Sequence, residues 1–293
     1  MKSKPRHKFA IPGLRKSLSH DRILGIADTI SLQPGSVTFD LCSEVKGMPP
    51  MLSGLQYRLL KVLYPRSPDL LTEAGGKSKL VLLGSDFLSK IPGRTVIDFG
   101  CGIGNEAIEM AQRGAARVTG IDIREENLQI ARESAARAGV QDRCVFATST
   151  METSDIIVSI DAFEHFKDPA EILRIMNSLL KPGGEILLSF GPTWYHPLGG
   201  HLFSVFPWAH LLFSEGALIQ WRATFKDDGA TRFSEVAGGL NQITIRKFEK
   251  LVAGSDFSLV RLEKVPIRKL KPIHNRLTQE FTTALVRGEL VKR

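Results

Sequence analysis

Short apolar runs alternate with amphipathic stretches from residue 79 onward. Short apolar runs predict buried strands, whereas apolar positions at helical spacing predict helices. The expected strands cover residues 95–99, 117–123, 144–148, 156–160, 185–190 and 258–265. The expected helices cover residues 80–91, 106–113, 125–138, 169–180 and 244–253. This alternation predicts a parallel sheet with helices on both faces. A last alternating stretch, 281–287, could pair antiparallel at the sheet edge.

The same pattern divides the chain into four segments. Residues 79–190 hold the regular alternation and form the expected core. Residues 1–78 contain scattered proline and glycine around short helical patterns such as 53–63, which predicts an irregular, mostly helical N-terminal extension. Residues 191–243 have no clear place in a minimal α/β unit, and residues 244–293 supply the helix and strands that complete the core.

Composition adds a basic charge that lies at the two ends. Of the 293 residues, 43% are hydrophobic and 24% are charged, which is usual for a globular chain with a sizeable core. The net charge is +8, yet residues 1–20 and residues 261–293 each contribute +6, so the body between them is at −4. Because the chain has no zinc-finger or RNP element, a nucleic-acid partner is not expected.

Cysteine usage and hydropathy indicate a reducing compartment. Cys42, Cys101 and Cys144 are odd in number and lack metal-ligand spacing, so we expect free thiols rather than disulfides. The basic N-terminus is not followed by an apolar signal region, and no stretch is long and apolar enough for a membrane span. A soluble, cytoplasmic protein is therefore expected.

A glycine-rich turn marks a candidate cofactor site. The strand at 95–99 runs into Gly100-Cys-Gly-Ile-Gly104 and then a helix, an arrangement that lets a ligand approach the backbone closely. Asp122 ends the next strand, where a carboxylate can accept both ribose hydroxyls of a nucleoside. Asp98 precedes the glycines, and its charge suits a cationic amino-acid group better than a pyrophosphate. The pair therefore favours S-adenosylmethionine over a dinucleotide.

Four motifs in order carry a family resemblance: Val96-Ile-Asp-Phe-Gly-Cys-Gly-Ile-Gly104, Val118-Thr-Gly-Ile-Asp122, Asp155-Ile-Ile-Val-Ser-Ile-Asp-Ala-Phe-Glu-His165 and Leu180-Lys-Pro-Gly-Gly-Glu-Ile-Leu-Leu188. They resemble the successive motifs of class I S-adenosylmethionine-dependent methyltransferases, in spelling closest to the broad group that includes the ubiquinone and menaquinone C-methyltransferases. The resemblance implies a Rossmann-like α/β fold, with a seven-stranded, mostly parallel sheet whose last strand is antiparallel.

The resemblance also implies residues for the cofactor. Gly100, Gly102 and Gly104 would line the methionine and ribose, Asp98 would support the amino-acid portion, Asp122 would bind the ribose hydroxyls and Ile123 would contact the adenine. The remaining residues expected to line the cofactor are Phe99, Cys101, Ser149 and Asp161. One departure concerns the adenine: a Gly-Asp pair that is frequent after strand three is absent here, which leaves Thr148 and Ser149 as candidates.

The end of strand four offers acid–base groups. Asp161, Glu164 and His165 follow this strand at its carboxyl end, where open α/β sheets place their ligands. His165 could act as a base, but Glu-His at this point occurs across the resembled family whatever the substrate, which favours a structural or cofactor-facing role. The Asp-Asn pair of metal-dependent catechol methyltransferases is replaced by Ser189-Phe-Gly-Pro192, so no metal is expected.

The segment 191–243 is expected to form a substrate cap over the methyl-donor site. It contains all three tryptophans and three of the seven histidines. Near the exit of strand five, Tyr195, His196 and His201 are candidate catalytic side chains. Two other interpretations stay open: the aromatic residues fill a core of the cap's own, or residues 205–219 form a lipid-facing or dimer-forming surface.

These observations favour S-adenosylmethionine-dependent methyl transfer to a small or lipid-like acceptor with an oxygen or carbon nucleophile. A nicotinamide oxidoreductase on the same fold is the first alternative, which Asp98 and the Leu180-Lys-Pro-Gly-Gly184 motif argue against. A non-catalytic binding module that uses the basic ends is the second. Neither the acceptor nor the oligomeric state follows from the sequence.

Overall fold

The computed structural model describes residues 50–65, 78–84, 86–226, 228–236 and 238–293. All of them fall in one compact unit, residues 45–293. Most of the segment 1–78, and with it Cys42, lies outside the described residues. Among those that are described, no helix has both the length and the apolar character to cross a bilayer.

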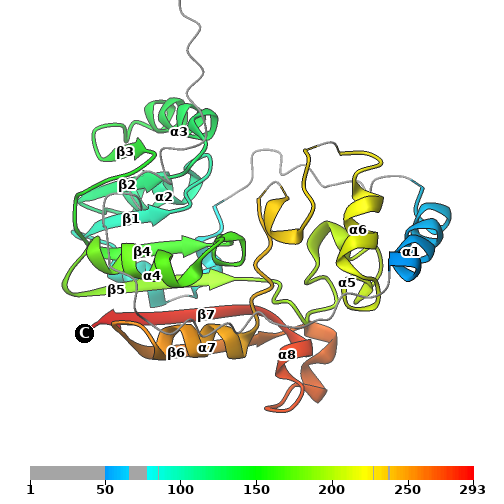
Figure 1. Ribbon diagram of the computed structural model, residues 1–293. Helices are drawn as coiled ribbons and strands as arrows, with labels where there is room; N and C mark the ends of the chain where they lie inside the picture. The colour runs from blue at the N-terminus through cyan, green and yellow to red at the C-terminus, as the bar shows by residue number, and fades with distance from the viewer. Residues whose placement is uncertain (1–49, 66–77, 85, 227, 237) are drawn as a thin grey trace, which may run out of the picture. The chain divides into compact units, whose positions relative to one another are not determined.

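A seven-stranded sheet forms the centre of the fold, with the strand order β3-β2-β1-β4-β5-β7-β6 (Figure 1). Five strands run parallel: β1 (Thr95–Phe99), β2 (Arg117–Ile121), β3 (Cys144–Ala147), β4 (Ser154–Ile160) and β5 (Leu180–Phe190). The strand β7 (Thr283–Lys292) is antiparallel to both β5 and β6 (Phe257–Pro266). The Rossmann-like architecture with a reversed last strand is thus confirmed.

The position of β7 corrects one expectation. This strand lies inside the sheet, and β6 forms the edge. Gly288 faces Leu188 of β5, where an added Cβ would sit 3.0 Å from a methyl of that leucine, so the glycine lets β7 approach β5 closely. Most of β6 is exposed or only partly buried, whereas Val286 and Leu290 of β7 are fully buried. Burial therefore places the final strand inside the sheet and its hairpin partner at the margin.

Helices cover both faces of the sheet. One apolar cluster joins Val96 to α2 (Asn105–Gln112) and α3 (Glu125–Arg137), and the other joins Ile97 to helices that follow β4 and the cap. Those helices are α4 (Pro169–Ser178) and α7 (Ile245–Ala253). Neighbouring residues of β1 thus point to opposite faces, as the pleat requires.

One expected helix has a different form. Residues 80–91 form two 3₁₀ segments, Leu80–Leu83 and Asp86–Lys90, rather than one α-helix. Gly84 follows the first segment with φ +97°, a left-handed value that ends the helical path. Leu80 and Phe87 nevertheless bury their side chains in the first apolar cluster. The apolar pattern predicted burial correctly but not the type of helix.

A third apolar cluster lies in the segment that follows β5. It combines Phe203, Trp221 and Phe233 with Leu60 from α1 (Pro50–Leu63). The helical segments here are 3₁₀ His201–Phe203, α5 (Ala209–Leu212), α6 (Glu215–Arg222) and 3₁₀ Phe233–Glu235. The Trp221 indole donates to the backbone oxygen of Tyr64 at 2.8 Å, so α1 and the segment after β5 share one core.

Three shorter segments complete the chain. A 3₁₀ turn, Phe163–His165, follows β4. Between β6 and β7 the chain forms a 3₁₀ segment, Arg268–Ile273, and the short helix α8 (Gln279–Thr282).

Candidate functional site

The glycine turn after β1 is shaped by close packing at two of its glycines. Gly100 has φ +87°, and a Cβ there would lie 2.9 Å from that of Ala162. Gly104 has φ +82°, and a Cβ there would lie 2.8 Å from atoms of Ala131 and Phe146. Beside Gly102, by contrast, no atom of the described residues lies within 4 Å of an added Cβ. The outer glycines permit packing, and the central one borders open space that a ligand can use.

Asp122 ties this turn to the end of β2. Its Oδ2 accepts a hydrogen bond from the backbone N–H of Gly102 at 3.0 Å, and its Oδ1 accepts one from that of Arg124 at 2.9 Å. Only 8% of the residue is exposed. Oδ1 also accepts from the Asn127 side-chain amide at 3.5 Å. The carboxylate thus orders the turn, and Oδ2 has a further lone pair with which it could accept a hydroxyl.

Asp98 is a buried carboxyl group with an unsatisfied oxygen. The residue is 2% exposed, and its Oδ2 has no hydrogen-bond partner among the described residues. Burial raises its pKa well above the usual range, and the charges of Glu106 and Asp122 raise it further, although the backbone N–H of Ala107 opposes them. A buried carboxyl group with one unpaired oxygen at the edge of the open turn fits a cationic group of a ligand, which would favour its ionised form.

The other side chains assigned to the cofactor differ in their environment. Phe99 is partly buried and packs edge-on to Phe166, whereas Cys101 is buried, which raises its thiol pKa. Ile123 is 72% exposed at the end of β2, and Ser149 is exposed in the loop after β3. Asp98, Asp122 and the glycine turn converge at the carboxyl ends of neighbouring parallel strands, as the sequence predicts for a nucleoside site.

Asp161 has a partner that sequence reasoning missed. Its Oδ2 accepts a hydrogen bond from the Lys79 ammonium at 2.9 Å, and its backbone has φ +49°. The backbone N–H of Lys79 donates in turn to the Glu106 carboxylate at 2.7 Å. Lys79 therefore links the loop after β4 to the first turn of α2. The only hint of this link in the sequence is the acidic residue Glu106, two positions after Gly104.

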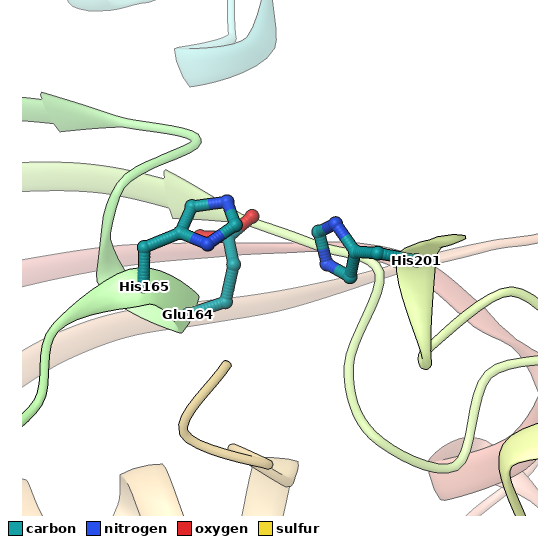
Figure 2. A group of neighbouring side chains, drawn as sticks. All are labelled: Glu164, His165 and His201. Atoms are coloured by element: carbon teal, nitrogen blue, oxygen red, sulfur yellow. The ribbon is translucent and has the colours of Figure 1, made fainter. Parts of the chain in front are cut away.

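A second group of side chains lies beyond the end of β4. Figure 2 shows Glu164 and His165 on one 3₁₀ turn with His201 across from them. One donor atom from each of the three lies within 4.8 Å of the others, and the two imidazole rings are 5.1 Å apart. The glycine turn lies close by in the chain's packing, because Ala162 contacts Gly100. Both histidines were candidate catalytic residues from the sequence, but their proximity was not predicted.

Hydrogen bonds orient this group and leave two of its atoms unpaired. Glu164 is 2% exposed, and its Oε1 accepts from the backbone N–H of Gly191 at 3.2 Å. His165 Nδ1 lies 2.9 Å from the backbone oxygen of Gly239, so Nδ1 donates this hydrogen bond and Nε2 is left for other contacts. Glu164 Oε2 and His201 Nε2 are buried without a partner among the described residues.

Burial shifts the pKa values of Glu164 and His201 away from their ordinary values. It raises the pKa of Glu164 to about 8, with Asp161 adding a like charge. It lowers the pKa of His201 to about 4, with His165 as a second cause. At neutral pH His201 is therefore a neutral imidazole, able to accept a proton. Two nitrogen donors and one carboxylate oxygen also form a donor set that a divalent transition metal accepts.

The remaining catalytic candidates lie outside this group. His196 Nδ1 accepts from the backbone N–H of Leu198 at 2.9 Å, so it stabilises the local turn. Tyr195 is 37% exposed, and its ring packs at a tilt against that of Phe281. His210 is buried, with its two ring nitrogens bonded to Ser204 Oγ and the Trp194 backbone oxygen, which indicates a structural role. Of the three histidines in 191–243, only His201 joins His165.

Comparison with known proteins gives a family model and two curated relatives that are methyltransferases. Residues 77–262 match the family model of a methyltransferase domain. A ubiquinone biosynthesis O-methyltransferase from Pseudomonas paraeruginosa is 40% identical over 105 residues, which cover 34% of this chain and 45% of that protein. The enzyme of the same name from Neisseria meningitidis is 39% identical over 104 residues, covering 33% and 44%. These matches span less than half of either relative.

Solved structures resemble the chain more loosely. Magnesium protoporphyrin IX methyltransferase from Synechocystis, with S-adenosylhomocysteine bound, is 18% identical and has a TM-score of 0.46. The superposition covers 75% of this chain and 90% of that one.

Proposed function

Because the chain belongs to the class I S-adenosylmethionine-dependent methyltransferases, we propose that it transfers a methyl group to an oxygen of a small or lipid-like acceptor. The name of the matched relatives supports oxygen over carbon as the nucleophile. The observation that carries the proposal is the unpartnered Nε2 of His201 beside His165 and Glu164. Neither a nicotinamide oxidoreductase nor a non-catalytic module is favoured by these matches.

On the donor side, the residues present fit the cofactor. S-adenosylmethionine, when bound, supplies a methyl group on a positively charged sulfur. Asp98 would accept its ammonium group, because this carboxyl group has a buried oxygen without a partner among the described residues. Asp122 would accept the ribose hydroxyls, and Gly102 offers the open space beside the turn. Ile123 and Ser149, both exposed at the same edge, remain our candidates for adenine contacts.

On the acceptor side, we propose that His201 is the general base. A hydroxyl group that loses its proton becomes a stronger nucleophile, and a neutral imidazole within hydrogen-bond reach can take that proton. His201 stays neutral above about pH 4, so its lone pair is available at neutral pH. The residues 191–243 that carry it would form the substrate cap. Glu164 and His165 would orient the hydroxyl.

The same three side chains offer a second role, which is to hold a divalent metal. The His165 Nδ1 contact to a backbone carbonyl is the usual way in which a protein orients a ligating imidazole. Titration with Co²⁺, followed by its visible absorption, separates the two roles. If His201 is a base, bound metal should inhibit turnover. If the three side chains hold a metal cofactor, chelation should abolish turnover and added metal should restore it.

Methyl transfer from labelled donor to a lysate of the source, followed by identification of the product, would find the acceptor. With that acceptor, we expect His201→Ala to lower turnover roughly a hundredfold while the donor Kd changes less than about threefold. Turnover of the wild type should decline as the pH falls toward about 4. His196→Asn is the matched control in the same segment and should keep nearly full activity. Unchanged turnover in His201→Ala would remove this residue from the mechanism.

We further propose the cytoplasm as the compartment. Of the three cysteines, the two within the described residues, Cys101 and Cys144, are free and buried, which suits a reducing environment.

A further inference from the structure

The connection between β6 and β7 presents three large apolar side chains to solvent. Leu277 is 91% exposed, Ile273 is 55% exposed and Phe281 is 44% exposed. A single exposed apolar residue is common on protein surfaces, but three within nine positions of one connection form a local apolar tip. We call residues 267–281 the β6–β7 connection.

Four cations surround this tip, and the only acid of the connection is occupied elsewhere. The exposed cations are Arg268, Lys269, Lys271 and Arg276, and none of them forms a salt bridge within the described part of the chain. The carboxylate of Glu280 accepts the backbone N–H groups of Ile245 at 3.1 Å and Arg246 at 2.9 Å. It therefore neutralises the start of α7 rather than the neighbouring cations.

Local hydrogen bonds hold the tip in place. Asn275 Oδ1 accepts from the backbone N–H of Leu277 at 2.8 Å, and Thr278 Oγ1 donates to the backbone oxygen of Ile273 at 2.6 Å. His274 Nδ1 pairs with Thr282 Oγ1 at 2.7 Å. These hydrogen bonds shape the turn without burying Leu277. An ordered turn that displays leucine loses little conformational freedom when that side chain enters an apolar phase.

We propose that the β6–β7 connection docks on the surface of a lipid bilayer that contains anionic lipids. Leu277 and Ile273 would enter the interface, while the four cations contact lipid phosphates, the combination by which peripheral proteins bind such membranes. A nucleic acid would use the cations but would give no role to an exposed leucine at the tip. The ring of Phe281 lies 5.2 Å from that of Tyr195, so this surface continues into the segment that we propose as the substrate cap.

The test is sedimentation of the full chain with vesicles of phosphatidylcholine alone or mixed with phosphatidylglycerol. We expect binding to the mixed vesicles only, weakening as salt rises. Leu277→Ser should weaken that binding roughly tenfold, and Lys269→Gln with Lys271→Gln should weaken it by at least as much. Residues 1–20 are also basic and could bind anionic vesicles themselves. The test of the proposal is therefore the difference in binding between each variant and the wild type.

Matched controls lie elsewhere on the surface. Met151→Ser removes a side chain of a residue that is 94% exposed in the loop after β3, and Lys226→Gln with Lys250→Gln removes two exposed cations. Both controls should bind as the wild type does. Equal binding by Leu277→Ser and the wild type would overturn the proposal. So would binding to RNA that is weakened by Lys269→Gln with Lys271→Gln but not by Leu277→Ser. The variants of the β6–β7 connection lie outside the proposed donor site, so donor binding should be unchanged by them. Failure of this proposal therefore leaves the proposed function intact.

Discussion

The donor side and the acceptor side of the site are built in different ways. Asp98, the glycine turn and Asp122 come from one strand–turn–helix unit and the strand beside it, and backbone hydrogen bonds join them. Glu164, His165 and His201 come from the end of β4 and from the segment after β5. That segment packs on its own apolar cluster, to which α1 contributes Leu60. The difference implies that mutation can disable either side while the other survives.

The largest effect is expected from Trp221→Ala, which should disrupt the acceptor side alone. Trp221 is 1% exposed at the centre of the third cluster, and its indole bonds to Tyr64. Trp221→Ala should cost about 3–5 kcal/mol of local stability, since it leaves a large cavity. We expect turnover to be lost while the donor Kd changes less than about threefold, measured by calorimetric titration with S-adenosylhomocysteine.

A buried aromatic under the sheet provides the control for this variant. Phe248 of α7 is fully buried in the second cluster, which also contains Ile97 of β1. Phe248→Ala should destabilise the sheet and so weaken donor binding and turnover together. If Trp221→Ala also abolished donor binding, the two sides would form one cooperative unit and the comparison would fail.

The donor side should break at Gly104. An added Cβ would meet Ala131 and Phe146 at 2.8 Å in a backbone with positive φ. Gly104→Ala combines overpacking with backbone strain, so we expect a loss of about 2–4 kcal/mol in unfolding free energy, measured with urea. Gly139→Ala is the matched control, because Gly139 has φ +68° and open space around it. It should lose only the strain, about 1 kcal/mol.

The same contrast explains what could be predicted from the sequence. The strand at Thr95–Phe99 and the glycine turn follow from local pattern, and the structure has this strand at the predicted bounds. Local pattern could not show that Gly84 divides the 80–91 segment, nor that Lys79 engages Asp161. The meeting of His165 and His201 depends on how the segment after β5 folds back. No periodicity in the sequence encodes such a contact, because it is set by packing between distant segments.

Asp98 should couple donor binding to proton release. Its pKa is raised by burial, and a bound cation would favour the ionised carboxylate, so part of a proton leaves on binding. Calorimetry in two buffers of different ionisation enthalpy measures this proton. Asp98→Asn should abolish the difference between the buffers and weaken donor binding roughly ten- to a hundredfold. Glu106→Gln, which removes a like charge, should reduce the proton release without abolishing it.

The smallest expected effect comes from Asp155, at the opposite end of the sheet. Its loss should affect the donor side and the acceptor side equally. Burial alone would raise the pKa of Asp155, but hydrogen bonds from Thr95 and Lys181 outweigh it and lower the pKa to about 2. A lowered carboxyl pKa stabilises the fold above about pH 4, and this contribution disappears as the pH falls toward about 2. Because the Lys181 partner is 41% exposed, solvent screening limits the contribution to about 1 kcal/mol.

Asp155→Asn should therefore lower the unfolding free energy by about 1 kcal/mol at neutral pH, and by progressively less as the pH falls through about 3. Urea unfolding of both proteins across this range measures the difference. Asp155 joins β1 to the start of β5 through Thr95 and Lys181, beneath both halves of the site. Donor binding and turnover should thus change little, and in parallel. A variant that lost turnover but kept donor binding would show that the acceptor side depends on this end of the sheet.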